Sequence, residues 1–315
     1  EKFDFDVANM KVIYNINTFK AEFGKFDRQW GPGNSSLTIS TKPPSFAQFG
    51  FQWAVHPKLN FTYFHGSLRS LIEDSLRSDY YTQVGNRIPE LDRYIAGHRI
   101  EWQITPVLKF GGSEFVVYGT RGIEINYLMS FIPFWSVQHY LGDLDNVQIS
   151  GDITWFPKSN VKVYGVFLID EWKPSLTFKY PNRNWFAWQC GLQIDETFLS
   201  SDKLRFEYTW TDHRIYRHRF SINDFYSHGY PIGFWGGPHA EELNINYSFE
   251  SKGYLISLSY SRAKRGELTE QMLTNQYATI EYERYSGITE TTRNIYLSIE
   301  KNIFNGLAIH FSISN

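Results

Sequence analysis

The sequence predicts an all-β protein: a transmembrane, antiparallel, up-and-down β-barrel of about 16–18 strands with long extracellular loops and short periplasmic turns. Three observations predict this fold. Apolar and polar residues alternate strictly, and most of the alternating runs are about ten residues long. Short and long connections between the runs also alternate along the chain. Because the 315 residues contain no linker, low-complexity tract or shift in composition, we expect a single barrel domain over residues 1–315.

The composition favours strands over helices. Aromatic residues make up 18% of the chain, with 26 Phe, 21 Tyr and 10 Trp, whereas Met occurs only 3 times. Aromatic side chains fit the pleated surface of a sheet, so this usage supports the all-β prediction. The formal net charge of −2 provides no field that would attract nucleic acid, and we therefore expect no nucleic-acid partner.

The alternation is clearest toward the C-terminal end of the chain. Residues 241–250 place Leu, Ile, Tyr and Phe at every second position, and the same pattern resumes at 254–261 after a short turn. Similar runs occur at 19–23, 49–55, 59–63, 100–104, 147–155, 161–169, 186–194, 204–210 and 307–314. We count about fifteen runs, and bacterial barrels have an even number of strands. One further strand is therefore expected before Glu1 or inside a long loop, with Ser36–Thr41 as the best candidate.

The connections predict a barrel with two different ends. Short turns separate some of the runs at His56-Pro57-Lys58, Pro157–Asn160 and Ser251–Gly253. The long connections are 28–45, 65–96, 120–145, 170–185, 212–240 and 263–276. Since an up-and-down sheet brings alternate connections to the same edge, we expect the long ones to gather at one end. Within them, Ser67–Arg77 predicts a short helix.

The two faces of the predicted strands favour a membrane barrel. One face is large and apolar, while the other carries polar groups such as Arg99, Glu101 and Gln103. In lipid, a closed barrel pairs every backbone group within its wall and turns polar side chains toward a hydrated lumen. We therefore expect the bacterial cell outer membrane as the location and its lipid as a partner. A soluble all-β protein, which would bury the apolar face against a second sheet, is the alternative.

Three further features concern targeting and redox chemistry. The sequence contains no run of about 18 apolar residues, so no transmembrane helix is predicted. It begins at Glu1 without a leader, and we expect that a signal peptide has been removed or that the N-terminal part of the gene product is missing. The single cysteine, Cys190, rules out a disulfide framework and falls on an apolar strand face.

No catalytic or cofactor motif stands out. We find no zinc-protease helix motif, nucleophile elbow, phosphate-binding glycine loop or paired-cysteine zinc site, so we expect no enzyme, no cofactor and no metal site. His213 and His218 would point to opposite faces of a strand, which excludes their joint binding of one metal ion. An outer-membrane phospholipase with a Ser–His pair stays open as an alternative, because serine and histidine are plentiful.

Five segments resemble the signature of a known family. In chain order they are WGPGNSSL at 30–37, GHRIEW at 97–102, DNVQISGDITWFP at 145–157, VYGVFLIDEW at 163–172 and HGYPIGFWGGPHAEEL at 228–243. Together they resemble the Wzi-type capsule-assembly family of outer-membrane barrels. The resemblance implies a barrel that helps to hold capsular or other surface polysaccharide on the cell without catalysing a reaction. Better-known members are longer and carry an N-terminal helical segment near the periplasmic mouth, which we do not expect in this chain.

The turn Trp30-Gly31-Pro32-Gly33 allows two interpretations. Pro32 fixes φ and the glycines allow positive φ, so a rigid structural turn is the interpretation we favour for the Gly-Pro-Gly. In the other interpretation, Trp30 stacks on a sugar while Arg28 pairs with the carboxylate of an acidic sugar. For Arg28 both interpretations stay open.

A basic cluster is followed directly by an aromatic loop. The cluster, DHRIYRHRF at 212–220, contains His213, Arg214, Tyr216, Arg217 and Arg219. The loop, FYSHGYPIGFW at 225–235, contains Tyr226, His228, Tyr230, Phe234 and Trp235. We hypothesise that both form one patch that binds acidic polysaccharide, because planar donors beside aromatic faces suit such a ligand. Alternatively, the cluster binds lipopolysaccharide phosphates or bridges loops, and the aromatic residues pack a plug or sit in an interfacial girdle.

The sequence thus predicts a non-enzymatic outer-membrane barrel that binds or anchors surface polysaccharide, capsule or lipopolysaccharide, and assists capsule assembly. The alternative is a passive porin-like channel, or a structural barrel subunit of a larger envelope complex with other envelope proteins as partners. About six connections exceed ~12 residues, and such long loops favour a closed top over an open pore.

Overall fold

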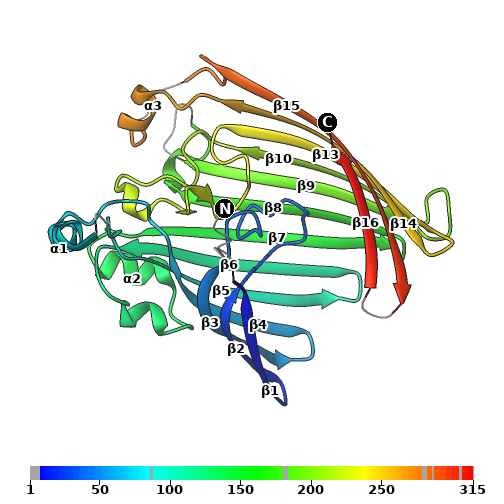
Figure 1. Ribbon diagram of the computed structural model, residues 1–315, viewed down its shortest axis with the longest axis horizontal. Helices are drawn as coiled ribbons and strands as arrows, with labels where there is room; N and C mark the ends of the chain where they lie inside the picture. Colours follow the sequence, from blue (N-terminus) through cyan, green and yellow to red (C-terminus); the bar gives the residue numbers. More distant parts are fainter. Residues whose placement is uncertain are drawn as a thin grey trace.

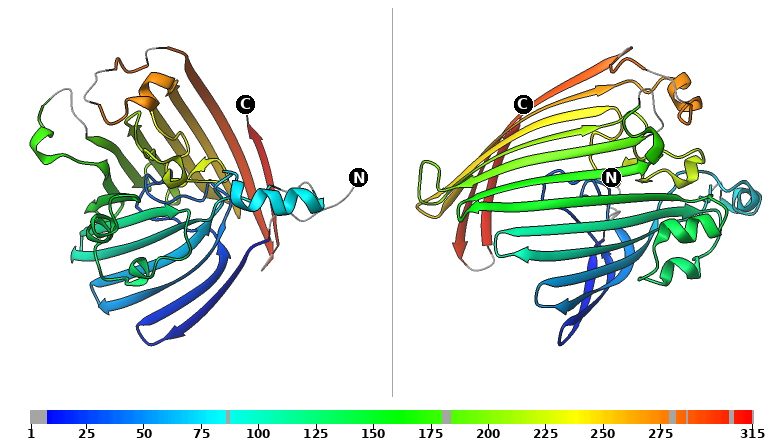
Figure 2. Two further views of the ribbon diagram at one scale, coloured as in Figure 1. Left: turned by 90° about the vertical axis from the view of Figure 1, so that its left-hand side faces the viewer. Right: turned by 180° about the vertical axis from the view of Figure 1, so that it is seen from behind.

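A computed structural model describes residues 8–85, 88–179, 184–278, 282–285, 287–304 and 307–314. Its main sheet has 14 strands, and each strand pairs with its neighbour along the chain (Figure 1). In the described residues the sheet begins with β1 (Met10–Ile16) and ends with β16 (Leu307–Ser314). The sheet curls into a wall around an interior, as the view from the loop end shows (Figure 2).

The remaining elements follow the chain. The other strands of the sheet are β2 (Phe19–Phe26), β3 (Phe46–His56), β4 (Leu59–Leu68), β5 (Arg93–Thr105), β6 (Leu108–Gly119), β7 (Asn146–Lys158), β8 (Val161–Glu171), β9 (Trp185–Asp195), β10 (Asp202–Thr211), β13 (Ala240–Ser251), β14 (Tyr254–Gly266) and β15 (Thr289–Phe304). The connections contain α1 (Ser75–Gly85), η1 (Ile125–Leu128), α2 (Phe134–Tyr140), η2 (Pro174–Leu176), η3 (Ser221–Asn223), β11 (Tyr226–Ser227), β12 (Tyr230–Pro231) and α3 (Glu270–Thr274). In the part of the chain described, no helix has the length and apolarity needed to cross a membrane.

The predicted antiparallel up-and-down architecture is confirmed. Every ladder of the sheet is antiparallel, and the long connections gather at the end of the wall where α1 and α2 lie (Figure 1). The predicted short turns join β3 to β4, β7 to β8 and β13 to β14 at the opposite end. That the long loops are extracellular and the short turns periplasmic stays a prediction.

The predicted strand count of about 16–18 is higher than the 14 strands that the sheet contains in the described residues. The predicted strand Ser36–Thr41 is not part of the wall. Its alternating residues Leu37 and Ile39 are 1% exposed inside the barrel, where the contact between Trp30 and Ile39 is an isolated β-bridge. A loop that packs in an interior can show the same alternation as a wall strand, so the pattern was misleading here. A strand before Glu1 would lie outside the described residues.

The predicted helix at Ser67–Arg77 is wrong in position. Strand β4 continues to Leu68, and α1 begins only at Ser75. The start of the helix is fixed by Asp74, whose Oδ1 accepts hydrogen bonds from the backbone N–H groups of Leu76 and Arg77 at 3.0 and 3.3 Å.

Each strand turns alternate side chains to opposite faces of the wall. On β9, Gln189 points inward and donates a hydrogen bond to the carbonyl of Ser35, whereas its neighbour Trp188 points outward and is 38% exposed. The inward face packs against loops that fold into the barrel, and this core includes Trp30, Leu37, Phe64, Phe115, Tyr216 and Phe234. A second core covers part of the outward face and includes Phe61, Tyr63, Val116, Tyr127, Phe134 and Val147.

Candidate functional site

The connection between β2 and β3, residues 27–45, folds into the barrel and reaches the opposite wall. Glu207 of β10 accepts hydrogen bonds from the backbone N–H groups of Asn34 and Ser35 at 2.7 and 2.9 Å. Lys162 of β8 donates from Nζ to the carbonyl of Pro32 at 2.9 Å. Because these contacts tie an inserted loop to the far side of the barrel, we call residues 27–45 the plug loop.

Arg28 and Trp30 both lie in the buried part of the plug loop. Trp30 is 7% exposed, and its ring centroid lies 5.2 Å from those of Phe64 and Phe115. Arg28 forms an ion pair with Glu22 on β2, and its guanidinium lies 4.6 Å from the Phe64 ring centroid. Arg28 also lines an interior cavity of about 420 Å³. The structure therefore brings Arg28 and Trp30 together, but inside the barrel and with protein partners.

The connection between β10 and β13, residues 212–239, packs on the plug loop. The Tyr216 hydroxyl donates a hydrogen bond to the carbonyl of Leu37 at 2.5 Å and accepts one from the N–H of Phe234 at 3.0 Å. Tyr216 and Phe234 are both 0% exposed. The two loops therefore share one apolar core, which fills the loop end of the interior.

The arginines of the basic cluster do not converge on one surface. Arg214 is 8% exposed and pairs through Nε with Asp212 at 2.9 Å. Arg217 pairs with Asp224 at 3.0 Å, at a different point of the loop. Arg219 is exposed, and its guanidinium donates to a backbone carbonyl of the connection between β6 and β7. Two of the three guanidinium charges are thus offset by carboxylates within the protein.

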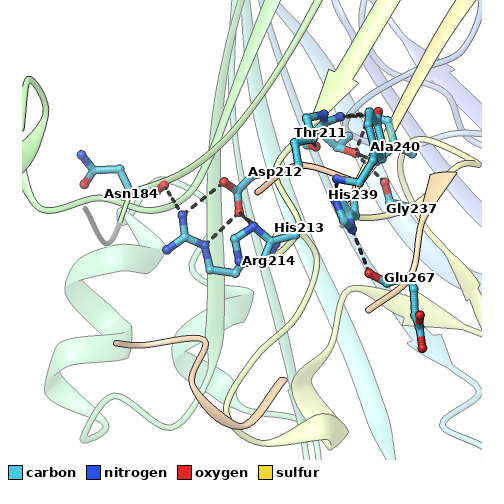
Figure 3. A network of polar contacts seen from close by, with 11 residues as sticks. Asn184, Thr211, Asp212, His213, Arg214, Gly237, His239, Ala240 and Glu267 are labelled. Carbon is cyan, nitrogen blue, oxygen red and sulfur yellow. Dashed lines mark hydrogen bonds and ion pairs between the residues drawn. The ribbon is translucent and has the colours of Figure 1, made fainter. Parts of the chain in front are cut away.

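His213 lies in a groove of about 450 Å³ that also includes Asp212, Arg214 and His239. Figure 3 shows the carboxylate of Asp212 between His213 and Arg214, while Nδ1 of His239 lies 2.9 Å from the carbonyl of Glu267. Burial lowers the pKa of His213 to about 4, so its imidazole is uncharged at neutral pH. With the histidine neutral and the arginine paired, these four residues offer little net positive charge to an anionic ligand.

The aromatic loop divides between the interior and the surface. Phe234 is fully buried, and Tyr226 and Trp235 are partly buried against the interior core. His228 is partly exposed, and Tyr230 is 55% exposed. The structure therefore does not gather the aromatic side chains and the basic cluster on one surface.

A cavity of about 710 Å³ lies at the loop end, between α2, the adjoining ends of β7 and β8, and the connection that follows β8. Trp135 and Trp172 line it and are 55% and 54% exposed. Arg219 and His218 line the same cavity, so the end of the predicted basic cluster reaches it. We call it the rim cavity and define it by Trp135, His139, Asp143, Glu171, Trp172 and Arg219.

The lining of the rim cavity combines flat apolar rings with groups that form hydrogen bonds. Tryptophan faces suit the apolar faces of sugar rings. Arg219 can donate hydrogen bonds to hydroxyl or carboxylate groups, and Asp143 and Glu171 can accept them from hydroxyl groups. Neither tryptophan was predicted as a site residue. Trp172 begins the connection after β8, and Trp135 lies within the connection between β6 and β7. Only the fold shows that the two side chains line one cavity.

The comparison with family models matches residues 1–314 to the family described as capsule assembly protein Wzi. The chain belongs to this family. The resemblance found in the sequence is therefore confirmed, and this Wzi-family chain is an outer-membrane barrel in its fold and location. The comparison with curated proteins gave no match.

Solved structures agree with the family fold. Wzi of Escherichia coli, described as an outer-membrane protein involved in group 1 capsule assembly and a carbohydrate-binding β-barrel, matches with a TM-score of 0.63 and 16% identity. The match covers 97% of this chain and 66% of that chain, so the Wzi-family chain spans slightly less than two thirds of the E. coli structure. OccK5 of Pseudomonas aeruginosa matches with a TM-score of 0.50 and 7% identity, over 97% of this chain and 75% of that chain. OccAB2 of Acinetobacter baumannii matches with a TM-score of 0.50 and 11% identity, over 98% and 71%.

Proposed function

We propose that this Wzi-family barrel binds surface polysaccharide, capsule or lipopolysaccharide, at the rim cavity and assists capsule assembly without catalysing a reaction. The observation that carries the proposal is the pair of half-exposed tryptophans, Trp135 and Trp172, in one cavity with Arg219. A ligand that covers two neighbouring exposed aromatic rings in one cavity removes apolar area from water, and sugar rings are such ligands. The name of the family and the carbohydrate binding given for E. coli Wzi support the same ligand class.

The plug loop supports this role over the porin-like alternative. Contacts from Glu207 and Lys162 to residues 32–35 place backbone across the interior. A wide pore would require these hydrogen bonds to break. We further propose that residues 1–315 form one barrel domain, because one sheet contains all the long strands described, and that lipid and other envelope proteins are its partners.

The test is binding of the purified barrel to immobilised capsular polysaccharide and lipopolysaccharide from its own bacterium. Replacing Trp135 and Trp172 together by alanine should weaken binding about 30-fold, because a central aromatic anchor contributes about 2 kcal/mol. Unchanged affinity in a folded double variant would contradict the proposal.

Two matched control variants distinguish the loss of rings that line the rim cavity from the loss of exposed aromatic rings in general. Tyr140→Ala removes an 82% exposed ring from the same helix as Trp135, and Phe178→Ala removes a fully exposed ring from the same connection as Trp172. Neither ring lines the rim cavity. We expect both control variants to bind like the unchanged protein.

A further inference from the structure

The connection between β6 and β7, residues 120–145, lies on the outward face of the wall. We call it the outer segment. Its Tyr127, Phe134 and Val137 are buried in the outward core together with wall residues of β4, β6 and β7. The hydroxyl of Tyr63, on β4, donates a hydrogen bond to the carbonyl of Tyr127 at 2.9 Å.

Polar groups of the wall hold the outer segment in place. Glu114, on the outward face of β6, accepts hydrogen bonds from the backbone N–H groups of Phe134 and Trp135 at 2.8 and 2.7 Å. His98 lies 2.9 Å from Glu114 through Nε2 and 2.9 Å from the carbonyl of Ser130 through Nδ1. A carboxylate and an imidazole on the outward face would be unfavourable in lipid without such partners. The segment therefore shields a polar site of the wall.

The free surface of the outer segment is apolar. Between Gly122 and Gly142 the only Asp, Glu, Lys or Arg residue is Glu124, which lies 3.6 Å from the Arg121 guanidinium. The exposed apolar side chains of this stretch include Ile123, Ile125, Leu128, Met129, Phe131 and Ile132. By contrast, the connection 69–92 at the same end of the barrel carries eight charged residues. A connection that projects into water is expected to look like 69–92, and the outer segment does not.

This apolar surface is continuous with the outward face of the wall. Phe131 is 64% exposed, and its ring centroid lies 4.7 Å from that of Phe61 and 6.3 Å from that of Trp53. Phe61 is the third residue of β4, close to the short-turn end of that strand. The outer segment thus descends along the wall rather than rising above it.

Several of its backbone N–H groups also have partners. Within the segment, the N–H groups of Tyr127, Ile132 and Leu141 donate to carbonyls of the segment itself at 2.9 to 3.1 Å. The N–H groups that begin α2 donate to Glu114, as described above. Satisfied backbone groups are the condition that a non-strand segment must meet beside lipid.

We infer that the outer segment lies in the membrane, with the exposed side chains of Ile125, Leu128, Met129 and Phe131 in contact with the acyl chains of the lipid. The occupant of this surface is lipid because the surface continues the lipid-facing wall and lacks charge. The lipid contact concerns the surface around Ile125, Leu128 and Phe131. Trp135, His139 and Asp143 of the same segment line the rim cavity instead, and the inference does not rest on polysaccharide binding there.

Spin labels on single cysteines test the inference in the full-length protein reconstituted into liposomes. Cys190→Ala removes the only native cysteine, and labels are then placed at Ile125→Cys or Phe131→Cys. The control, Leu76→Cys, lies in α1 at the same end of the barrel and is 95% exposed. Collision rates with oxygen, which concentrates in lipid, and with a water-soluble nickel chelate locate each label.

Labels at 125 and 131 should collide with oxygen and be protected from the nickel chelate, while the label at 76 should show the reverse. Access of the nickel chelate to both test positions would overturn the inference. Protection from both reagents would also overturn it, since a second protein would then cover the surface. Phe131→Cys removes a ring that packs on Phe61 and could disturb the segment. Ile125 is 72% exposed, so Ile125→Cys removes little packing and provides a second label position.

Discussion

The carboxylate of Glu207 accepts a 2.7 Å hydrogen bond from the backbone N–H of Asn34, which lies 173 positions earlier in the chain. The same side chain accepts a second bond from the N–H of Ser35 at 2.9 Å and a third from the hydroxyl of Tyr164. Glu207 is 3% exposed, so these donors replace the water that its charge has lost. One wall residue thus holds the tip of the plug loop.

Glu207→Gln should release this tip. Glutamine has the size of glutamate but no charge. Its NH₂ group would face at least one of the groups that now donate to the carboxylate, so that hydrogen bond would be lost. We expect the free energy of unfolding to fall by about 2–3 kcal/mol, because hydrogen bonds to a buried charge are the strong ones. Urea unfolding followed by tryptophan fluorescence measures this change. Glu101→Gln is the control, since that interior carboxylate is 53% exposed and should lose less than about 1 kcal/mol.

Gly233→Ala should separate the two interior loops. A Cβ at this position would lie 2.3 Å from the carbonyl oxygen of Leu37 and 2.6 Å from the hydroxyl of Tyr216. Since the nearest atom belongs to the backbone, relief requires a loop to move, and we expect a loss of about 1–3 kcal/mol. Thermal unfolding provides the measurement. Gly122→Ala has no atom within 4 Å of the added Cβ, and a similar loss there would contradict the explanation.

Arg214→Ala should destabilise the fold rather than act only on binding. The substitution removes the guanidinium that pairs with Asp212, whose side chain is 15% exposed. The carboxylate keeps the hydrogen bond from the backbone N–H of residue 214, so we expect a loss of about 1–3 kcal/mol. Asp212→Asn in the same chain should recover part of the loss, because the uncompensated charge is then removed. Chemical unfolding of the single and double variants measures both effects.

This expectation changes how retention of polysaccharide is tested. The sequence suggests Arg214→Ala with Arg217→Ala as the variant that weakens retention of acidic polysaccharide, but both arginines pair with carboxylates in the structure. Arg219→Ala is the cleaner probe, because this exposed residue lines the rim cavity. We expect weaker glycan binding with a change in stability within about 0.5 kcal/mol.

His218 should make the folded state less stable in acid. Burial, and then the nearby charge of Arg219, lower its pKa to about 4 from the ordinary value of 6.5. The unfolded chain therefore binds the proton first, so stability is complete above pH 6.5 and falls as the pH drops from 6.5 to 4. At pH 5 the loss from this group is about 2 kcal/mol.

His218→Asn isolates this contribution. Nδ1 of His218 accepts a hydrogen bond from the N–H of Phe220 at 3.2 Å, and an asparagine oxygen can replace it. Burial raises the pKa of the neighbouring Asp224 to about 6, which favours the folded state in acid and so opposes the histidine. Since Asp224 is present in both proteins, the difference between their unfolding free energies at pH 7.5 and pH 5 reports His218. An equal acid loss in both would refute the assignment.

The sequence predicted the wall of the barrel well because strand alternation is local. The runs at 186–194, 204–210 and 241–250 coincide with β9, β10 and β13, since each residue shows on its own whether it suits lipid or a polar interior. The same rule failed at Ser36–Thr41, where Leu37 and Ile39 alternate because they pack inside the barrel. Alternation of apolar and polar residues shows that the two faces of a segment lie in different environments. It does not show whether the apolar face contacts lipid or the protein interior.

The chain sequence by itself determined the barrel class, the order of short turns and long loops, and the family. Only the tertiary structure decided that Arg28 and Trp30 face protein inside the plug and that the arginines of the cluster diverge to separate partners. It alone brought Trp135 and Trp172 to one cavity. The physical reason is that a strand's face follows from neighbours two positions away, whereas a loop's position depends on partners more than a hundred residues distant, such as Glu207 for Asn34.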